Sequence, residues 1–169
     1  YHGSASGLST TPAWTAESNQ ASAFFGRSVA SAGDLNGDSF SDVLIAAPWY
    51  DHVETDEGRV FGYHGSASGL STVPAWTAES DQDDAFFGAV TAPAGDVNGD
   101  GYSDVIIGAP NYDHGETDEG SVFVYHGSAA GLSASPAWTA ESDQAQALFG
   151  SAVAAAGDVN GDGYSDVIV

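Results

Sequence analysis

Hydrophobic residues along this chain come in short runs, and clusters of glycine, proline, serine and acidic residues separate them. Apolar runs bounded by turn-forming residues predict β-strands. No segment sustains the hydrophobic period of about 3.6 residues that marks an amphipathic helix. The 22 glycines also interrupt the chain too often for long helices. The pattern therefore predicts an all-β fold.

Four strand-like segments recur in a fixed order. We expect a first strand at residues 24–30, a second at 41–48 and a third at 58–65. A fourth is expected at 12–18 and again at 74–80. The second segment is apolar at successive positions, which is typical of a strand that is covered on both faces.

This order repeats every 62 residues, so that 1–62 and 63–124 agree at 45 of 62 positions, and a third, truncated copy covers 125–169. Four strands per repeat predict a β-propeller of four-stranded antiparallel blades. Strand sets are expected at about 24–80 and 86–142, with parts of split blades at 1–18 and 149–169. About 2.7 repeats cannot close a ring. We therefore expect one incomplete propeller, completed by homo-oligomerisation or by the remainder of a longer propeller.

A loop with the pattern Asp-x-Asn-x-Asp-x-x-x-Asp follows the first strand of each repeat. Ca²⁺ takes six to eight oxygen ligands in a flexible geometry. Side chains at loop positions 1, 3, 5 and 9 would supply oxygen, and position 7 would supply its backbone carbonyl. We expect three Ca²⁺ ions, one per loop, each stabilising its blade. The predicted ligands are Asp34, Asn36, Asp38, Phe40 and Asp42; Asp96, Asn98, Asp100, Tyr102 and Asp104; and Asp158, Asn160, Asp162, Tyr164 and Asp166.

An EF-hand loop begins in the same way but requires a glutamate at position 12, on a helix. Position 12 is Ile45, Ile107 or Val169 here, within a predicted strand. The loop is therefore expected to join two β-strands. A metal-free turn held by its own aspartates is the alternative, but three copies that keep every ligand position favour the metal site.

The motifs around the loop resemble the FG-GAP repeat of integrin α-subunit propellers and related bacterial surface proteins. The resemblance covers essentially the whole chain, and it implies a Ca²⁺-stabilised propeller used in adhesion or recognition at the cell surface. The first repeat has Ala46 in place of the glycine of GAP, which we expect to change packing and not metal binding. The matching segments are Phe25-Gly26 with Ala46-Ala47-Pro48, Phe87-Gly88 with Gly108-Ala109-Pro110, and Phe149-Gly150.

The formal net charge is −22, and Arg27 and Arg59 are the only cationic residues besides histidine. Such a surface repels the phosphate backbone of nucleic acids and anionic membranes alike. No apolar run is long enough to span a bilayer. The absence of cysteine excludes disulfides. Calcium loops of modest charge suit a calcium-rich environment, which favours an extracellular location.

Fifteen of the 24 acidic residues lie outside the loops, in turns that a meander of four strands places at the opposite rim. The turns at 51–57 and 113–119 could form a recognition face for a cationic partner or an extra divalent ion. A solubilising or salt-adapted surface is the alternative, and we favour that interpretation.

Three recurrent tryptophans, Trp14, Trp76 and Trp138, could stack on sugars, but packing between blades is the favoured interpretation. Trp49 occurs once and is expected to be exposed. Lysine and cysteine are absent, and no carboxylate pair departs from the repeat, so we expect no enzymatic activity. The leading hypothesis is a non-catalytic module for protein recognition or adhesion. A glycan-binding lectin and a self-assembling repeat array remain alternatives, with the protein or glycan ligand unknown.

Overall fold

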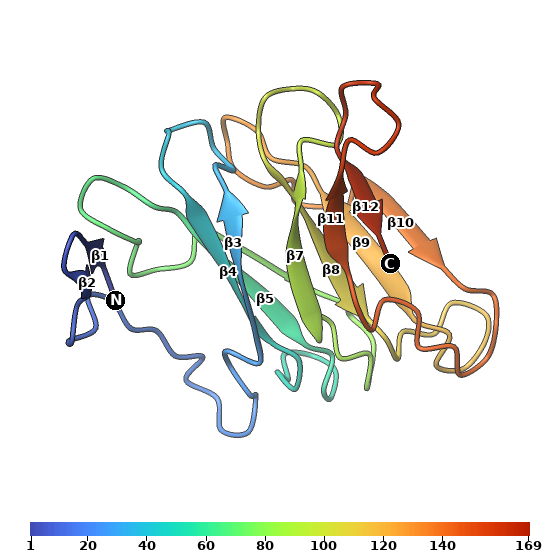
Figure 1. Cartoon of the computed structure of the whole chain (residues 1–169). Helices are drawn as coiled ribbons and strands as arrows, with labels where there is room; N and C mark the ends of the chain where they lie inside the picture. The colour runs from blue at the N-terminus through green and yellow to red at the C-terminus, as the bar shows by residue number, and fades with distance from the viewer.

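A computed structural model describes all of residues 1–169, and it is all-β (Figure 1). Two four-stranded antiparallel sheets dominate, with the strand orders β3-β4-β5-β6 and β7-β8-β9-β10, and β1-β2 and β11-β12 form two-stranded hairpins. The strands are β1 (Gly3–Ser4), β2 (Gly7–Leu8), β3 (Ser28–Gly33), β4 (Asp42–Ala47), β5 (Arg59–Tyr63), β6 (Trp76–Glu79), β7 (Val90–Gly95), β8 (Asp104–Ala109), β9 (Ser121–Tyr125), β10 (Trp138–Glu141), β11 (Ala154–Gly157) and β12 (Asp166–Ile168). The predicted four-stranded antiparallel blades are confirmed. The structure contains no helix long and apolar enough to cross a membrane.

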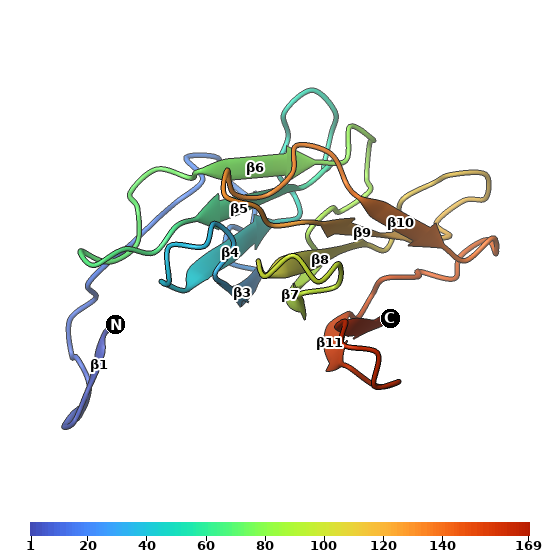
Figure 2. The same ribbon diagram turned by 90° about the horizontal axis from the view of Figure 1, so that it is seen from above.

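The sheets stand side by side like the blades of a propeller. Seen from above, β3, β7 and β11 follow one another along the inner side, whereas β6 and β10 lie at the outer side (Figure 2). The blades describe an open arc and not a closed ring, as expected from the number of repeats.

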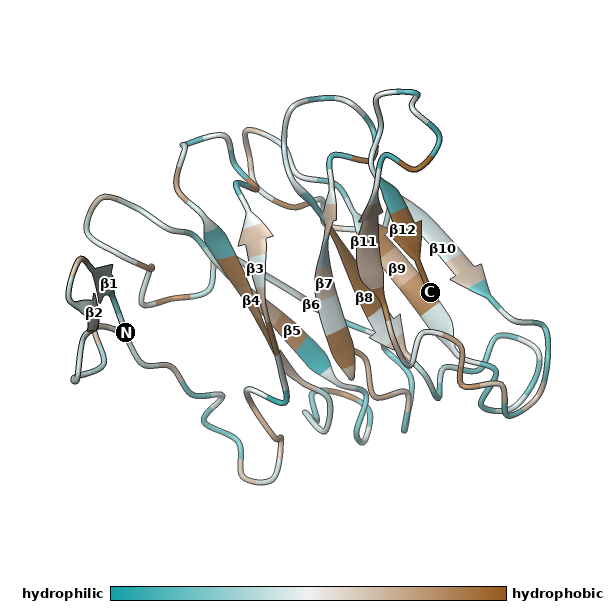
Figure 3. Cartoon of the chain, in the orientation of Figure 1, coloured by the Kyte–Doolittle hydropathy of each residue, from teal (hydrophilic) through white to brown (hydrophobic).

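The central strands β4 and β8 carry the core: most of their residues are hydrophobic (Figure 3), and all but Val43 are buried. Between the two sheets, Leu44 and Val60 of one blade pack with Phe87, Val105 and Ile107 of the next. A second hydrophobic cluster joins β8 and β9 to the β11-β12 hairpin and includes Ile106 and Val167. Each blade is therefore stabilised mainly by its neighbours.

The FG glycine belongs to this contact between blades. Gly88 has φ +85°, and a Cβ added to it would lie 2.6 Å from Val60 Cγ2 and 2.9 Å from Ala46 Cβ. Its N–H donates to the carbonyl of Gly108 in its own sheet at 3.0 Å. Glycine is required at this position because any side chain would collide with the preceding blade.

Three expectations were wrong in detail. The first strand starts at Ser28 and not at residue 24. Phe24 has φ +54°, and the N–H of Arg27 donates to the carbonyl of Phe24 at 2.9 Å, which closes a turn before the strand. Residues 12–18 form no strand, since β6 and β10 each pair with a preceding third strand that these residues lack. Trp49 is half-buried, with its ring 4.7 Å from that of Phe24 and 5.3 Å from that of Phe86.

Candidate metal centres

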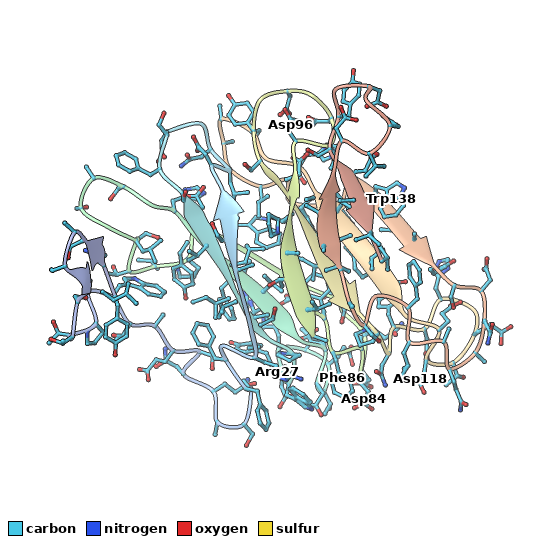
Figure 4. The ribbon with its side chains drawn as sticks, viewed as in Figure 1. Arg27, Asp84, Phe86, Asp96, Asp118 and Trp138 are labelled. Atoms are coloured by element: carbon cyan, nitrogen blue, oxygen red, sulfur yellow. The ribbon has the colours of Figure 1, made fainter.

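The three aspartate loops connect β3 to β4, β7 to β8 and β11 to β12, so they lie together at one rim of the blades. We call this the loop rim. The opposite, turn rim is formed by residues 48–58, 80–89 and 110–120. Figure 4 shows Asp96 at the loop rim, and Asp84 and Asp118 at the turn rim. The two groups of acidic residues are thus separated by the length of the strands.

The aspartate at position 1 organises each loop. In the first loop, Asp34 Oδ1 accepts the N–H of Gly37 at 2.7 Å and of Asp38 at 3.1 Å, while Oδ2 accepts the N–H of Ser39 at 2.7 Å. Burial acts to raise the pKa of Asp34, but these N–H donors outweigh it and hold the pKa below its usual value. The carboxylate is therefore kept ionised.

Asp96 and Asp158 accept the corresponding N–H groups of their own loops. In the third loop the N–H of Gly163 is the largest influence, and it lowers the pKa of Asp158 against a smaller opposing effect of burial. The three loops consequently share one geometry.

The side-chain oxygen of position 3 lies beside that of position 1. The N–H of Asp38 bonds to Asn36 Oδ1 at 3.0 Å as well as to Asp34 Oδ1, which places these two oxygens beside each other. Asn36 Nδ2 donates to Asp38 Oδ2 at 3.0 Å. The other two loops repeat this arrangement. Side-chain oxygens of positions 1 and 3 thus lie together within each loop, and the position 5 carboxylate is hydrogen-bonded to the position 3 amide.

The aspartate at position 9 has a structural role that sequence analysis missed. Asp104 is fully buried, and its Oδ2 accepts the N–H of Val97 while its Oδ1 accepts the N–H of Gly127, each at 2.8 Å. Asp42 makes the same two bonds, to Leu35 and Gly65. This residue therefore ties its loop to the segment that follows the third strand of its blade.

The environment of Asp104 opposes its negative charge. Burial raises its pKa above the usual value, although the N–H groups of Val97 and Gly127 and the nearby His126 act in the opposite direction, and the charge of Asp100 adds a smaller increase. A positive charge nearby would relieve the cost of keeping this carboxylate ionised. The third loop differs, because Asp166 is only partly buried and the N–H of Val159 is its one hydrogen-bond donor.

Neighbouring loops are joined to each other. The N–H of Ser103 donates to the carbonyl of Asp34 in the preceding blade at 3.0 Å, and Ser165 bonds in the same way to Asp96 at 2.9 Å. The ring of Tyr102, at position 7, lies so close to Gly37 that a Cβ there would come within 2.7 Å of it. The loop rim is therefore one connected layer. The use of the position 7 carbonyls of Phe40, Tyr102 and Tyr164 as ligands stays a prediction.

At the turn rim, a glutamate closes each acidic turn. Glu57 is fully buried, and its Oε1 accepts the N–H of His52 at 2.7 Å and of Val53 at 3.0 Å. Glu119 is 1% exposed, and its Oε1 accepts the backbone N–H of His114 at 2.7 Å and of Glu116 at 3.3 Å. These acids are not merely solubilising, because they cap the turn from inside. The sequence signal for this capping role was the Asp-Glu-Gly segment that precedes the third strand in both complete repeats.

The tryptophans bridge blades through their indole N–H groups. Trp14 Nε1 donates to the Ser71 carbonyl at 2.8 Å, and Trp76 Nε1 donates to the Ser133 carbonyl at 2.9 Å. Trp76 also packs edge-on against Tyr125, with the ring centroids 5.0 Å apart. Trp138 is 47% exposed. Packing thus engages two of the three recurrent tryptophans.

Comparison with known proteins shows the family of the repeat. The sequence profile described as the FG-GAP repeat matches residues 25–63, 87–125 and 149–169. Integrin alpha-4 of Xenopus laevis is 36% identical over 151 residues, which cover 86% of this chain and 14% of the frog protein. Integrin alpha-PS2 of Drosophila melanogaster is 38% identical over 161 residues, covering 86% of this chain and 11% of its own length. The chain therefore spans only about a seventh or less of these relatives.

Proposed function

The chain belongs to the FG-GAP repeat family, and we propose that it is a calcium-stabilised propeller segment that presents a non-catalytic recognition surface outside the cell. The integrin alpha relatives support a role in adhesion or protein recognition. The same relationship favours a surface or extracellular location and gives no reason to expect catalysis. Calcium in this proposal holds the blades in place and is not part of a reaction.

One observation carries the calcium assignment. In each of three loops, a single N–H at position 5 bonds to side-chain oxygens of both position 1 and position 3, so the oxygens converge. Position 5 adds a carboxylate, and the loop joins two strands that hold its ends together. Carboxylate and amide oxygens in a short flexible loop are the ligands that Ca²⁺ prefers.

Calcium would also reduce the repulsion between these carboxylates. Each loop contains three aspartates, and the chain has only two cationic residues besides histidine to offset a net charge of −22. A divalent ion at each loop would neutralise the local charge where neighbouring loops are hydrogen-bonded together. We therefore assign Ca²⁺ the role of a clamp along the whole loop rim.

Calorimetric titration of Ca²⁺ into the metal-stripped chain tests this proposal. We expect three binding events and a rise in melting temperature, since ligand at 100 times its Kd stabilises by about 2.7 kcal/mol per site. Asp96→Asn should remove one event. Asp83→Asn is the matched control, because it removes the same charge from a turn-rim residue whose Oδ1 accepts the Thr55 N–H. Absence of both heat and thermal shift would overturn the calcium assignment.

A glycan-binding function is the second candidate, and exposed Trp138 is the observation that favours it. It lines a hollow of about 640 Å³ with Asn98, His126 and Phe149, and an exposed aromatic ring beside polar groups suits a sugar. Binding of the calcium-loaded chain to panels of purified extracellular proteins and glycans separates the two functions. Saturable protein binding supports recognition of proteins. Glycan binding that Trp138→Ala abolishes supports the lectin.

A further inference from the structure

The turn rim contains two copies of a cluster made of one histidine and two glutamates. In the second blade, His114 and Glu119 lie in the β8-β9 turn and Glu141 ends β10. The first blade repeats the arrangement with His52, Glu57 and Glu79. Within each cluster, the imidazole nitrogen and carboxylate oxygens that could bind a metal all lie within 4.8 Å of one another. Neither cluster belongs to the aspartate loops.

A buried carboxylate oxygen without a hydrogen-bond partner lies in the first cluster. Glu57 is fully buried, and while Oε1 caps the turn, Oε2 has no hydrogen-bond partner. In the second cluster, both hydrogen bonds to the nearly buried Glu119 also end on Oε1. An unpaired carboxylate oxygen that is shielded from water costs free energy unless it meets a positive charge. This oxygen therefore points to a cation as a missing partner.

The histidine and the outer glutamate of each cluster are in direct contact with each other. The distance from the histidine Nδ1 to the glutamate Oε1 is 2.8 Å for His114 and Glu141, and 3.0 Å for His52 and Glu79. Two ligands of one tetrahedral Zn²⁺ lie about 3.3 Å apart, given metal–ligand bonds of about 2.0–2.1 Å. A small rotation of either side chain would open this distance. Imidazole with carboxylate is also a donor set that suits a divalent transition metal better than Ca²⁺.

The two clusters differ at one strand position. Arg59 lies opposite Glu79 in the β5-β6 register, and its Nε is 3.4 Å from Glu79 Oε2. Ser121 takes this position opposite Glu141 in the second blade. There, a hollow of about 280 Å³ is lined by His114, Ser121 and Glu141 among others. The first cluster therefore includes its own cation, whereas the second has two carboxylates, no arginine and an adjacent space.

We propose that His114, Glu119 and Glu141 form a binding site for a divalent transition-metal ion of the Zn²⁺ type, and that Arg59 weakens its counterpart in the first blade. The ion would cross-link the β8-β9 turn to the outer strand β10. Three protein ligands leave a coordination position open to water or to a side chain of a binding partner. The turn rim would then offer metal-dependent recognition that is separate from the calcium loops.

Titration of Zn²⁺ into the full chain, with the loops saturated by Ca²⁺, tests the proposal. We expect one stronger and one weaker site. His114→Ala and Glu141→Gln should each abolish the stronger site without unfolding the chain, because both side chains are more exposed than Glu119. His2→Ala is the control, since it removes an exposed histidine outside both clusters. Unchanged Zn²⁺ binding in His114→Ala would overturn the proposal.

A reciprocal exchange tests the role of the arginine. Ser121→Arg should weaken Zn²⁺ binding at the second cluster, and Arg59→Ser should strengthen it at the first. Each change should be on the order of tenfold or more, because it alters the charge beside a ligand by one unit. If neither exchange changes the Zn²⁺ affinity, or if the chain binds no Zn²⁺, the clusters are ion pairs that hold the turn and the proposal is wrong.

Discussion

The loop rim and the turn rim are both acidic, but they assemble their carboxylates differently. At the loop rim, the oxygens of Asp34, Asn36 and Asp38 come from a few residues of chain and accept N–H groups of their own loop. At the turn rim, Glu57 meets Glu79 only because β6 pairs with β5. A site formed within one loop can be recognised from its motif, whereas one shared by a turn and a distant strand depends on the register of the sheet.

The largest effect should come from the buried aspartate that anchors a loop. Asp104→Ala leaves the N–H groups of Val97 and Gly127 without their charged partner, and we expect a loss of about 3 kcal/mol in unfolding free energy. Asp166→Ala removes the corresponding carboxylate of the third loop, which is partly buried and accepts one N–H, from Val159. Its loss should be at most about 1 kcal/mol. Denaturant unfolding with calcium removed measures both, and equal losses would show that burial does not distinguish the loops.

A second test concerns the FG glycines at the start of each blade. Gly88→Ala combines a positive φ with a collision against Val60 and should cost about 2–3 kcal/mol. Gly26 has nearly the same φ, +87°, but open space around it. Gly26→Ala should therefore cost only about 1 kcal/mol. Thermal unfolding of the two variants measures the difference, and a cost for Gly26→Ala as large as for Gly88→Ala would place the whole effect in backbone strain.

Calcium should slow hydrogen exchange at the loop rim more than at the turn rim. Saturating Ca²⁺ should slow hydrogen exchange at the loop N–H groups of Gly99 and Gly101 by about tenfold or more, because opening the loop releases the ion. The N–H groups of His114 and Gly120 at the turn rim should change much less. Exchange measured by NMR with and without calcium provides the comparison. Uniform protection of both rims would mean that calcium stabilises the chain globally and not through the loop rim.

The smallest effect should come from removing the exposed ion pair at the turn rim in the absence of metal. His114 and Glu141 are 2.8 Å apart, but the histidine side chain is 65% exposed. We expect His114→Ala to change the unfolding free energy by at most about 1 kcal/mol when no transition metal is present. Chemical denaturation with a chelator checks this value. A loss of more than about 2 kcal/mol would make the pair a structural element in its own right.

The sequence alone was sufficient for the central strands of the blades, because these depend on local pattern. The alternation of apolar runs and turns predicted β4 and β5 to within two residues at either end. The start of β3 was missed because Phe24 adopts a positive φ, which its side chain does not predict. The environment of Trp49 was missed because the rings around it come from two successive repeats.

What the sequence determined by itself is the repeat, the all-β blade and the order of oxygen-bearing residues in each loop, since these are set by neighbours along the chain. The tertiary structure decided which carboxylates are buried and which residues share a site. Asp104 is anchored by Gly127 from beyond the next strand, and Glu119 meets Glu141 across β9. The physical reason is that sheet register and packing between blades bring together groups whose separation along the chain conceals their proximity.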